Sequence, residues 1–140
     1  MKICIKSNYQ MDWNDMEDAI NPSTPSARLK ELANHHSDVI RTHVASNPNT
    51  PKAVRSRLMK DELVVYGLKV KEANNPNTSP KRLAELALDP DDNIRSTVAM
   101  NPATPAKVLK QLASDPSENV RSGLLFNPNA PTYMKFKHKR

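Results

Sequence analysis

The sequence has one cysteine, two glycines and no long apolar run. A single thiol, Cys4, cannot close an internal disulfide, and no hydrophobic stretch reaches the roughly twenty residues that a membrane-spanning helix needs. The apolar part of the first residues is too short for a secretion signal, so we expect a cytoplasmic protein that does not engage a membrane. The glycines, Gly67 and Gly123, lie far apart, and a glycine-rich phosphate loop is absent.

Residue patterns that support catalysis or metal binding are also missing. No serine stands in a nucleophile elbow, and the carboxylates that recur along the chain have the structural roles described below. His35, His36 and His43 lack a His-x-x-x-His pair and a nearby cysteine. We therefore expect no enzymatic activity, no metal and no cofactor.

The chain has a repeated motif instead. Asn-Pro occurs at Asn21, Asn47, Asn75, Asn101 and Asn127, at steps of 26, 28, 26 and 26 residues. A fixed period in this range is typical of a solenoid, in which each repeat packs on its neighbours. We predict an all-α solenoid of four helical-pair repeats over residues 21–126, an N-terminal cap over 1–20, and a partial repeat with a basic tail over 127–140.

Each repeat predicts two short helices. The first helix begins at a Thr-Pro or Ser-Pro step, where a hydroxyl can cap a backbone N–H and proline suits the first helical position. These steps are Thr24-Pro25, Thr50-Pro51, Ser79-Pro80 and Thr104-Pro105. Leucines and an alanine at i, i+3, i+4 spacing then predict a buried stripe. Its members are Leu29, Leu32, Ala33, Leu83, Leu86, Ala87, Leu109, Leu112 and Ala113.

The second helix is predicted to begin near Asp61, Asp89 or Asp115, with Pro90 and Pro116 at the first helical position. It ends before each Asn-Pro, because proline restricts the residue that precedes it. The pairs Val44-Ala45, Val98-Ala99 and Leu124-Leu125 are predicted to close the core. The segment from Leu63 to Val70 also fits a strand, but the surrounding period favours a helix.

Three second helices contain an acid followed three residues later by an arginine. The pairs are Asp38 with Arg41, Asp92 with Arg95, and Glu118 with Arg121. This spacing brings the two charges within reach, and stacked copies predict a structural ladder between repeats. The alternative is that the arginines contact a ligand on a concave face.

The repeated motifs resemble those of the leucine-rich repeat variant family, a relative in style of HEAT-type repeats. They are Asn-Pro-x-Thr-Pro, Leu-x-x-Leu-Ala and acid-x-x-Arg-x-x-Val-Ala. The match covers about residues 21–131. The resemblance implies a right-handed superhelix of alternating α-helices and short, often 3₁₀, helices. The steps here are slightly longer than the family's usual unit. One family member holds an iron–sulfur cluster, but Cys4 alone cannot supply its thiolates.

The second repeat departs from this pattern and has a basic excess. Arg55 stands where other repeats have leucine, and the segment from Asp61 to Asn74 holds two extra residues. A repeat that breaks its pattern is a candidate binding site, although solvated lysines on a longer helix are an alternative. The candidate binding residues are Lys52, Arg55, Arg57, Lys60, Lys69 and Lys71, with Lys135, Lys137, Lys139 and Arg140 in the tail.

Trp13, Met16, Ala19 and Ile20 predict a cap helix whose indole seals the first core layer. Stacking of Trp13 on a base or sugar is the alternative. In the tail, Tyr133 and Met134 either cover the end of the core or belong to a nucleic-acid contact.

Taken together, the residues predict a non-enzymatic binding module or scaffold. Its partner is foremost a protein, and the alternative is nucleic acid or ribonucleoprotein bound by the basic second repeat and tail. A homo-oligomer is compatible with an incompletely covered fifth repeat. A DNA-repair enzyme on a helical-repeat scaffold is the least favoured hypothesis, because it needs Trp13 or a tyrosine beside a carboxylate in a pocket.

Overall fold

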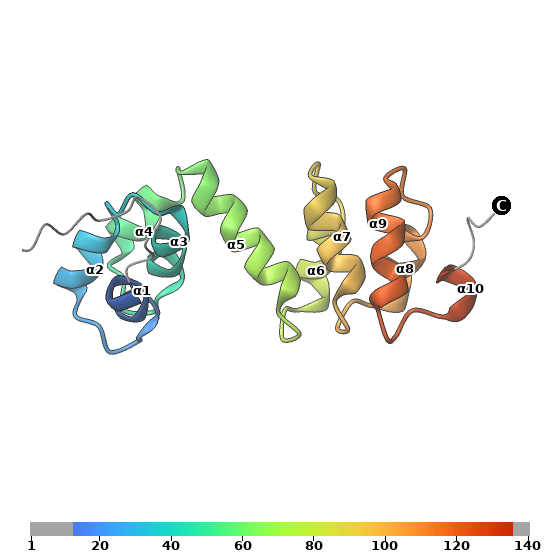
Figure 1. The fold of residues 1–140 in the computed structure, drawn as a ribbon, viewed down its shortest axis with the longest axis horizontal. Coiled ribbons are helices and arrows are strands. Elements are labelled where there is room, and N and C mark those ends of the chain that lie inside the picture. Colours follow the sequence, from blue (N-terminus) through green and yellow to red (C-terminus); the bar gives the residue numbers. More distant parts are fainter. Residues whose placement is uncertain (1–12, 136–140) are drawn as a thin grey trace, which may run out of the picture. The chain divides into compact units, whose positions relative to one another are not determined.

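The computed structural model describes residues 13–135, and the elements in this range are all helical. Ten α-helices and one 3₁₀ helix follow one another, and the described residues form no strand (Figure 1). The all-α prediction is therefore confirmed. The segment that also fitted a strand lies within the longest of these helices, α5, which spans Glu62–Asn74.

The helices fall into two sets that alternate along the chain. The first helices begin after the Asn-Pro turns and are α2 (Ser26–Leu32), α4 (Lys52–Leu58), α6 (Pro80–Leu86), α8 (Ala106–Leu112) and α10 (Thr132–Lys135). The second helices end at the Asn-Pro turns and are α1 (Trp13–Ile20), α3 (Asp38–Ser46), α5, α7 (Asp92–Met100) and α9 (Glu118–Gly123). The 3₁₀ helix η1 (Leu124–Phe126) continues α9.

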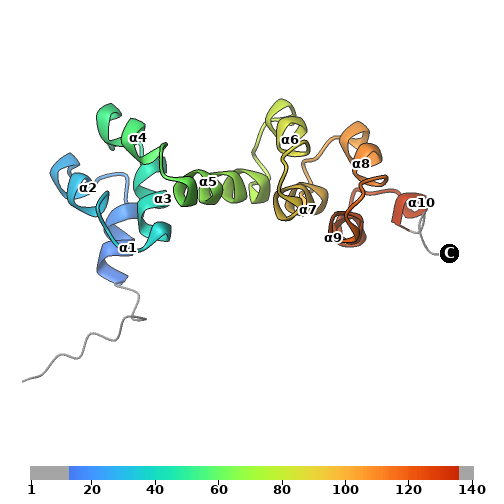
Figure 2. The same cartoon turned by 90° about the horizontal axis from the view of Figure 1, so that it is seen from above.

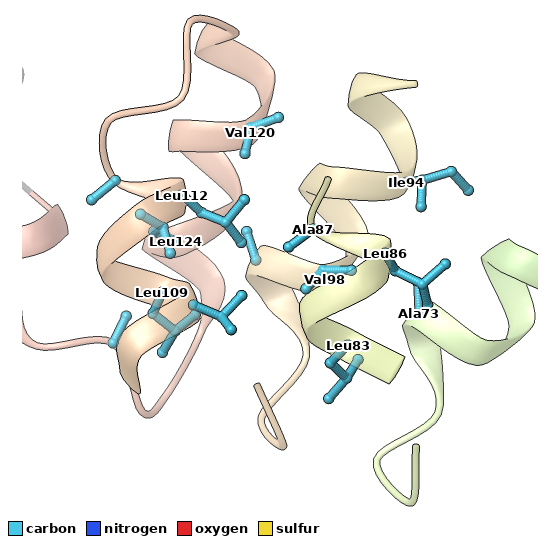
Figure 3. Close-up of a cluster of buried hydrophobic side chains, with 14 of the residues drawn as sticks. Ala73, Leu83, Leu86, Ala87, Ile94, Val98, Leu109, Leu112, Val120 and Leu124 are labelled. Carbon is cyan, nitrogen blue, oxygen red and sulfur yellow. The ribbon is translucent and has the colours of Figure 1, made fainter. Parts of the chain in front are cut away.

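The chain divides into two compact units, Met1–Leu68 and Lys69–Arg140. The core of the first unit includes Met16 and Ala19 of α1, Ile40 of α3 and Val64 of α5. The core of the second unit lies between the first and second helices of its repeats, and Figure 3 shows leucines of α6 and α8 meeting aliphatic side chains of α7 and α9. Within the described residues, no helix is long and apolar enough to cross a membrane.

The predicted leucine and alanine stripe of the first helices is buried at all nine positions. Val44, Ala45, Val98, Ala99 and Leu124 are buried as well. The prediction for the residue after Leu124 is wrong, because Leu125 is 43% exposed. The chain tightens into η1 at this point, and three residues per turn orient the side chains differently from an α-helix.

The cap helix α1 forms, but its tryptophan is not buried. Met16 and Ala19 face the core, and α1 packs against α2 and α3. Trp13 is 73% exposed, so the prediction that its indole seals the core is wrong. Trp13 is the first residue of α1 and lies one turn beyond Met16, which is already at the margin of the core with 9% exposure.

The threonines of the Thr-Pro steps do not cap the first helices. Each hydroxyl instead donates to a carbonyl six residues earlier, where the last turn of the preceding second helix leaves acceptors without a helical partner. At the Thr-Pro steps these bonds join Thr24 to Asp18 O and Thr50 to Val44 O at 2.6 Å, and Thr104 to Val98 O at 2.7 Å. At the Ser79-Pro80 step, Thr78, the residue before the serine, makes the same bond to Glu72 O at 2.6 Å. Of the four steps, only Ser79-Pro80 caps as predicted, with the Ser79 hydroxyl accepting from Arg82 N.

Helix α5 begins directly after Asp61, as predicted, but α7 and α9 begin later than predicted. Pro90 and Pro116 lie two residues before α7 and α9 and do not occupy the first helical position. The delay has a local cause, because Asp89 and Asp115 first form turns in which a side-chain oxygen accepts the backbone N–H two residues later.

Candidate interaction surface

Buried asparagines join consecutive repeats within each unit. The side-chain amide of each donates to two carbonyls of the repeat before it, and its oxygen accepts the backbone N–H two residues later. Asn47 bonds Ala19 O and Asn21 O, Asn101 bonds Ala73 O and Asn75 O, and Asn127 bonds Ala99 O and Asn101 O, all at 2.8–2.9 Å. The turn predicted from the sequence is therefore only one structural reason for the recurrence of Asn-Pro. The other is this set of bonds between repeats, which the sequence did not reveal.

Arg55 takes this role at the second repeat. Its Nε donates to Ala45 O at 3.1 Å and its Nη2 donates to Asn47 O at 2.8 Å. These two carbonyls correspond to the pairs that accept from asparagine elsewhere, while Asn75, the next asparagine of the series, is exposed. The guanidinium that looked like a ligand contact is thus bonded to the backbone of its own unit.

A charged ladder exists, but its partners differ from those predicted. A cation on a second helix pairs with an aspartate twenty residues later, in the turn before the next second helix. The rungs are Arg41–Asp61 at 3.0 Å, Lys69–Asp89 at 2.8 Å and Arg95–Asp115 at 2.9 Å. Lys69 therefore supplies the ladder cation of the second repeat, whose second helix is not among the three with the acid–arginine spacing.

Within residues 13–135, the acids three residues before the arginines form no hydrogen bond or ion pair with them. Arg41, Arg95 and Arg121 each donate Nη1 to the carbonyl six residues earlier, at 2.7–2.8 Å. This bond holds the guanidinium beside the turn, where Arg41 and Arg95 reach the next aspartate rather than the acid of their own helix. Asp92 instead accepts from the Ser117 hydroxyl at 2.8 Å.

At the first rung of the ladder the acid and the nitrogen base exchange places. Asp15 is on the second-helix side and His35 takes the turn position, with Nε2 3.2 Å from Asp15 Oδ2. His35 Nδ1 accepts from Ser37 N at 3.0 Å, as the turn aspartates do from their own backbone. Its ring also stacks on His36 with centroids 4.3 Å apart. His35 therefore has a structural role, and the described residues contain no metal-binding cluster of histidine, cysteine and acids.

The ladder aspartates are held in the charged form. Burial acts to raise the pKa of Asp115, but hydrogen bonds from Arg95 and Ser117 N, together with the charge of Arg95, lower it below its ordinary value. The pKa of Asp89 is lowered in the same way, against burial, by Lys69 and Asp91 N. On the cation side, the hydrogen bond to Asp115 raises the pKa of Arg95.

Charge is sorted between the two sets of helices. Basic residues outnumber acidic ones by ten to two on the first helices, whereas the second helices carry eight acids and five bases. The ten are Arg28, Lys30, Lys52, Arg55, Arg57, Lys81, Arg82, Lys107, Lys110 and Lys135, and the two acids are Glu31 and Glu85. In each unit the first helices lie to one side, as α6 and α8 do relative to α7 and α9 in Figure 2.

No family model, curated protein or solved structure matches this chain. The resemblance to leucine-rich repeat variant proteins therefore stays a prediction.

The predicted binding residues differ in where the structure places them. Arg55 and Lys69 are bonded within the fold, whereas Lys52, Arg57 and Lys60 are exposed in and just after α4, with Arg57 donating to Asn34 Oδ1 at 3.0 Å. Lys71 is exposed on α5 and Lys135 is half-buried in α10. The remaining three, Lys137, Lys139 and Arg140, lie outside the described residues.

Cations that the second-repeat hypothesis overlooked lie on other first helices. Lys30, Lys81, Lys107 and Lys110 are exposed and form no ion pair with the described residues. Two first-helix arginines are neutralised: Arg28 by Asp15, Asp18 and Glu31, and Arg82 by Glu72 and Glu85. A count of charge per predicted helix, rather than per repeat, would have found this surface in the sequence.

Proposed function

We propose that this chain is a non-enzymatic helical-repeat module that binds a protein partner through the exposed surface of its first helices. One observation carries the proposal. The recurrent asparagines, threonines and ladder charges are bonded within the fold, while the lysines of α2, α4, α6 and α8 are exposed and form no ion pair with the described residues. Binding modules display such solvent-facing residues on a scaffold whose repeated residues serve packing.

The proposal includes a right-handed solenoid of four repeats, as the resemblance to leucine-rich repeat variant proteins implies. Its support is the bonding between repeats within each unit, made by the asparagine amides and the charged rungs. The proposal also includes a cytoplasmic location, on the sequence argument from the single cysteine.

Site-specific photo-crosslinking in extract of the native host tests this function. A photoreactive residue replaces Gln111, which is exposed on the first helix α8, or Asn119, which is exposed on the second helix α9. The matched pair belongs to the same repeat. We expect a defined protein adduct from position 111 and little from position 119. Adducts from position 119 alone, or from neither position, would reject the proposed surface.

Nucleic-acid binding is the second candidate, because exposed lysines can also neutralise phosphates. The bonding of Arg55 and Lys69 within the fold removes two of the cations that first suggested it. A salt series with duplex and single-stranded DNA tests this candidate, since affinity carried by phosphate contacts falls steeply as salt rises.

A further inference from the structure

Three exposed lysines form a row on the first helices of the second unit. Lys81 and Lys107 each lie six residues after the asparagine that opens their repeat, so they occupy the same place one repeat apart. Lys110 follows Lys107 by three residues and therefore shares its helix face. In Figure 2, α6 and α8 lie on the same side of the second unit. The residues of the first unit that correspond to Lys81 and Lys107 are Ala27 and Ala53, whereas Lys110 corresponds to Lys30, so the pair Lys81 and Lys107 is particular to the second unit.

The acids around the row are already paired. Glu85, the acid of α6, bonds Arg82 Nη1 at 3.1 Å, and Arg82 Nε binds Glu72. Asp89 and Asp115, in the turns that follow α6 and α8, pair with Lys69 and Arg95. The positive charge of the lysine row is therefore not neutralised by the described residues, and an acidic ligand can meet it without breaking an ion pair of the fold.

We propose that the row of Lys81, Lys107 and Lys110 binds an acidic segment of a polypeptide. This inference rests on the proposed function and names the chemistry of the partner. Ammonium groups are compact charges on flexible stems and suit carboxylates that are spaced irregularly along a chain. Because salt screens the attraction between exposed lysines and carboxylates, the affinity should fall as the salt concentration rises.

Several observations favour a polypeptide over nucleic acid. Neither α6 nor α8 contains an aromatic residue, so the row lacks a platform on which bases could stack. Two arginines of the unit, Arg82 and Arg95, are held by acids rather than available for base edges. In the second unit, Lys69–Arg140, seven acidic residues are interspersed among the twelve basic ones. A DNA duplex, with a charge every ~1.7 Å, would interact with the acidic residues of the unit as well as with its lysines, whereas an acidic segment of a polypeptide can contact the row alone.

The test uses the full chain and a fluorescent glutamate homopeptide of about twenty residues, long enough to span two helices. The row variant is Lys81→Gln with Lys107→Gln and Lys110→Gln. The matched control is Lys30→Gln with Lys52→Gln and Arg57→Gln, which removes three exposed cations from the first helices of the first unit. Circular dichroism verifies that both variants fold. We expect the row variant to bind the peptide about tenfold more weakly than the unchanged chain, and the control to lose less than about threefold.

Three results would overturn the inference. Equal losses in both variants would mean that net charge, not the row, holds the peptide. If the chain binds a twenty-base-pair DNA duplex more tightly than the peptide at 0.15 M salt, the row is a nucleic-acid contact and not a site for an acidic polypeptide. No binding of the peptide by the unchanged chain would reject an acidic partner. The proposed function would still stand in that case if position 111 crosslinks a protein in host extract, so the two failures are distinguishable.

Discussion

Replacement of Asn101 by alanine is expected to destabilise the second unit by about 3 kcal/mol. The buried side chain donates to Ala73 O at 2.8 Å and to Asn75 O at 2.9 Å, and it accepts from Ala103 N at 2.9 Å. A hydrogen bond contributes about 1 kcal/mol net, and partners left buried without water add a desolvation cost. Three lost bonds therefore give about 3 kcal/mol, which lowers the folding equilibrium constant on the order of a hundredfold.

Asn75 provides the matched control, because the same residue type occupies the same place in its motif. It is exposed, and its side chain accepts from Asn77 N at 2.9 Å. Asn75→Ala should therefore cost less than about 1 kcal/mol. The two substitutions share the loss of an Asx turn, so their difference isolates the two carbonyl bonds of Asn101.

Hydrogen exchange followed by mass spectrometry suits this comparison, because a chain with two units need not unfold in one step. Protection of α7 and α9 reports on the second unit, and protection of α3 is the internal reference. We expect Asn101→Ala to speed exchange in α7 and α9 and to leave α3 unchanged. Equal effects of Asn101→Ala and Asn75→Ala, or a loss below about 1 kcal/mol for Asn101→Ala, would refute the bridging role.

Three further predictions test other parts of the structure. Arg55→Leu restores the residue type of the other repeats, but it should lower the unfolding free energy of the first unit by about 1–3 kcal/mol, because Ala45 O and Asn47 O lose their donor. Urea denaturation measures this change, and a more stable variant would contradict the prediction. Gly123→Ala should lower the melting temperature despite the higher helix propensity of alanine, because its Cβ would lie 2.8 Å from Ser96 O, and a raised melting temperature would show that the contact is relieved. The pKa of Asp115 is lower in the folded protein than in the unfolded chain, so its charge stabilises the fold above about pH 4, and this contribution is lost as the pH falls further. Asp115→Asn should therefore flatten the dependence of the unfolding free energy on pH in that range. An unchanged slope would exclude the Arg95–Asp115 pair as its source.

Local signals account for what could be predicted from the sequence. The leucine stripe follows from i, i+3, i+4 spacing, and Leu29, Leu83 and Leu109 are all buried. The helix over Leu63–Val70 follows from the surrounding period rather than from its own composition. In both cases neighbouring residues within one repeat carry the information.

The partners of polar side chains could not be predicted in this way. The i, i+3 rule assigned Asp92 to Arg95, but the arginine pairs with Asp115, twenty residues away. Arg55 looked like a ligand contact because the spacing of residues does not reveal its acceptors. These are Ala45 O and Asn47 O, at the end of the preceding helix and in the turn after it. Trp13 shared the spacing of buried residues, but the spacing does not reveal where the core ends.

The sequence by itself determined the repeat, the helical class and the apolar stripe, because each of these depends on residues one or two helical turns apart. It also contained the sorting of charge between first and second helices, which becomes visible once the helix bounds are known. Only the tertiary structure decided which asparagine, arginine and threonine bonds are made and which lysines remain exposed. Those outcomes depend on distances between residues of different helices, and spacing along the chain does not specify such distances.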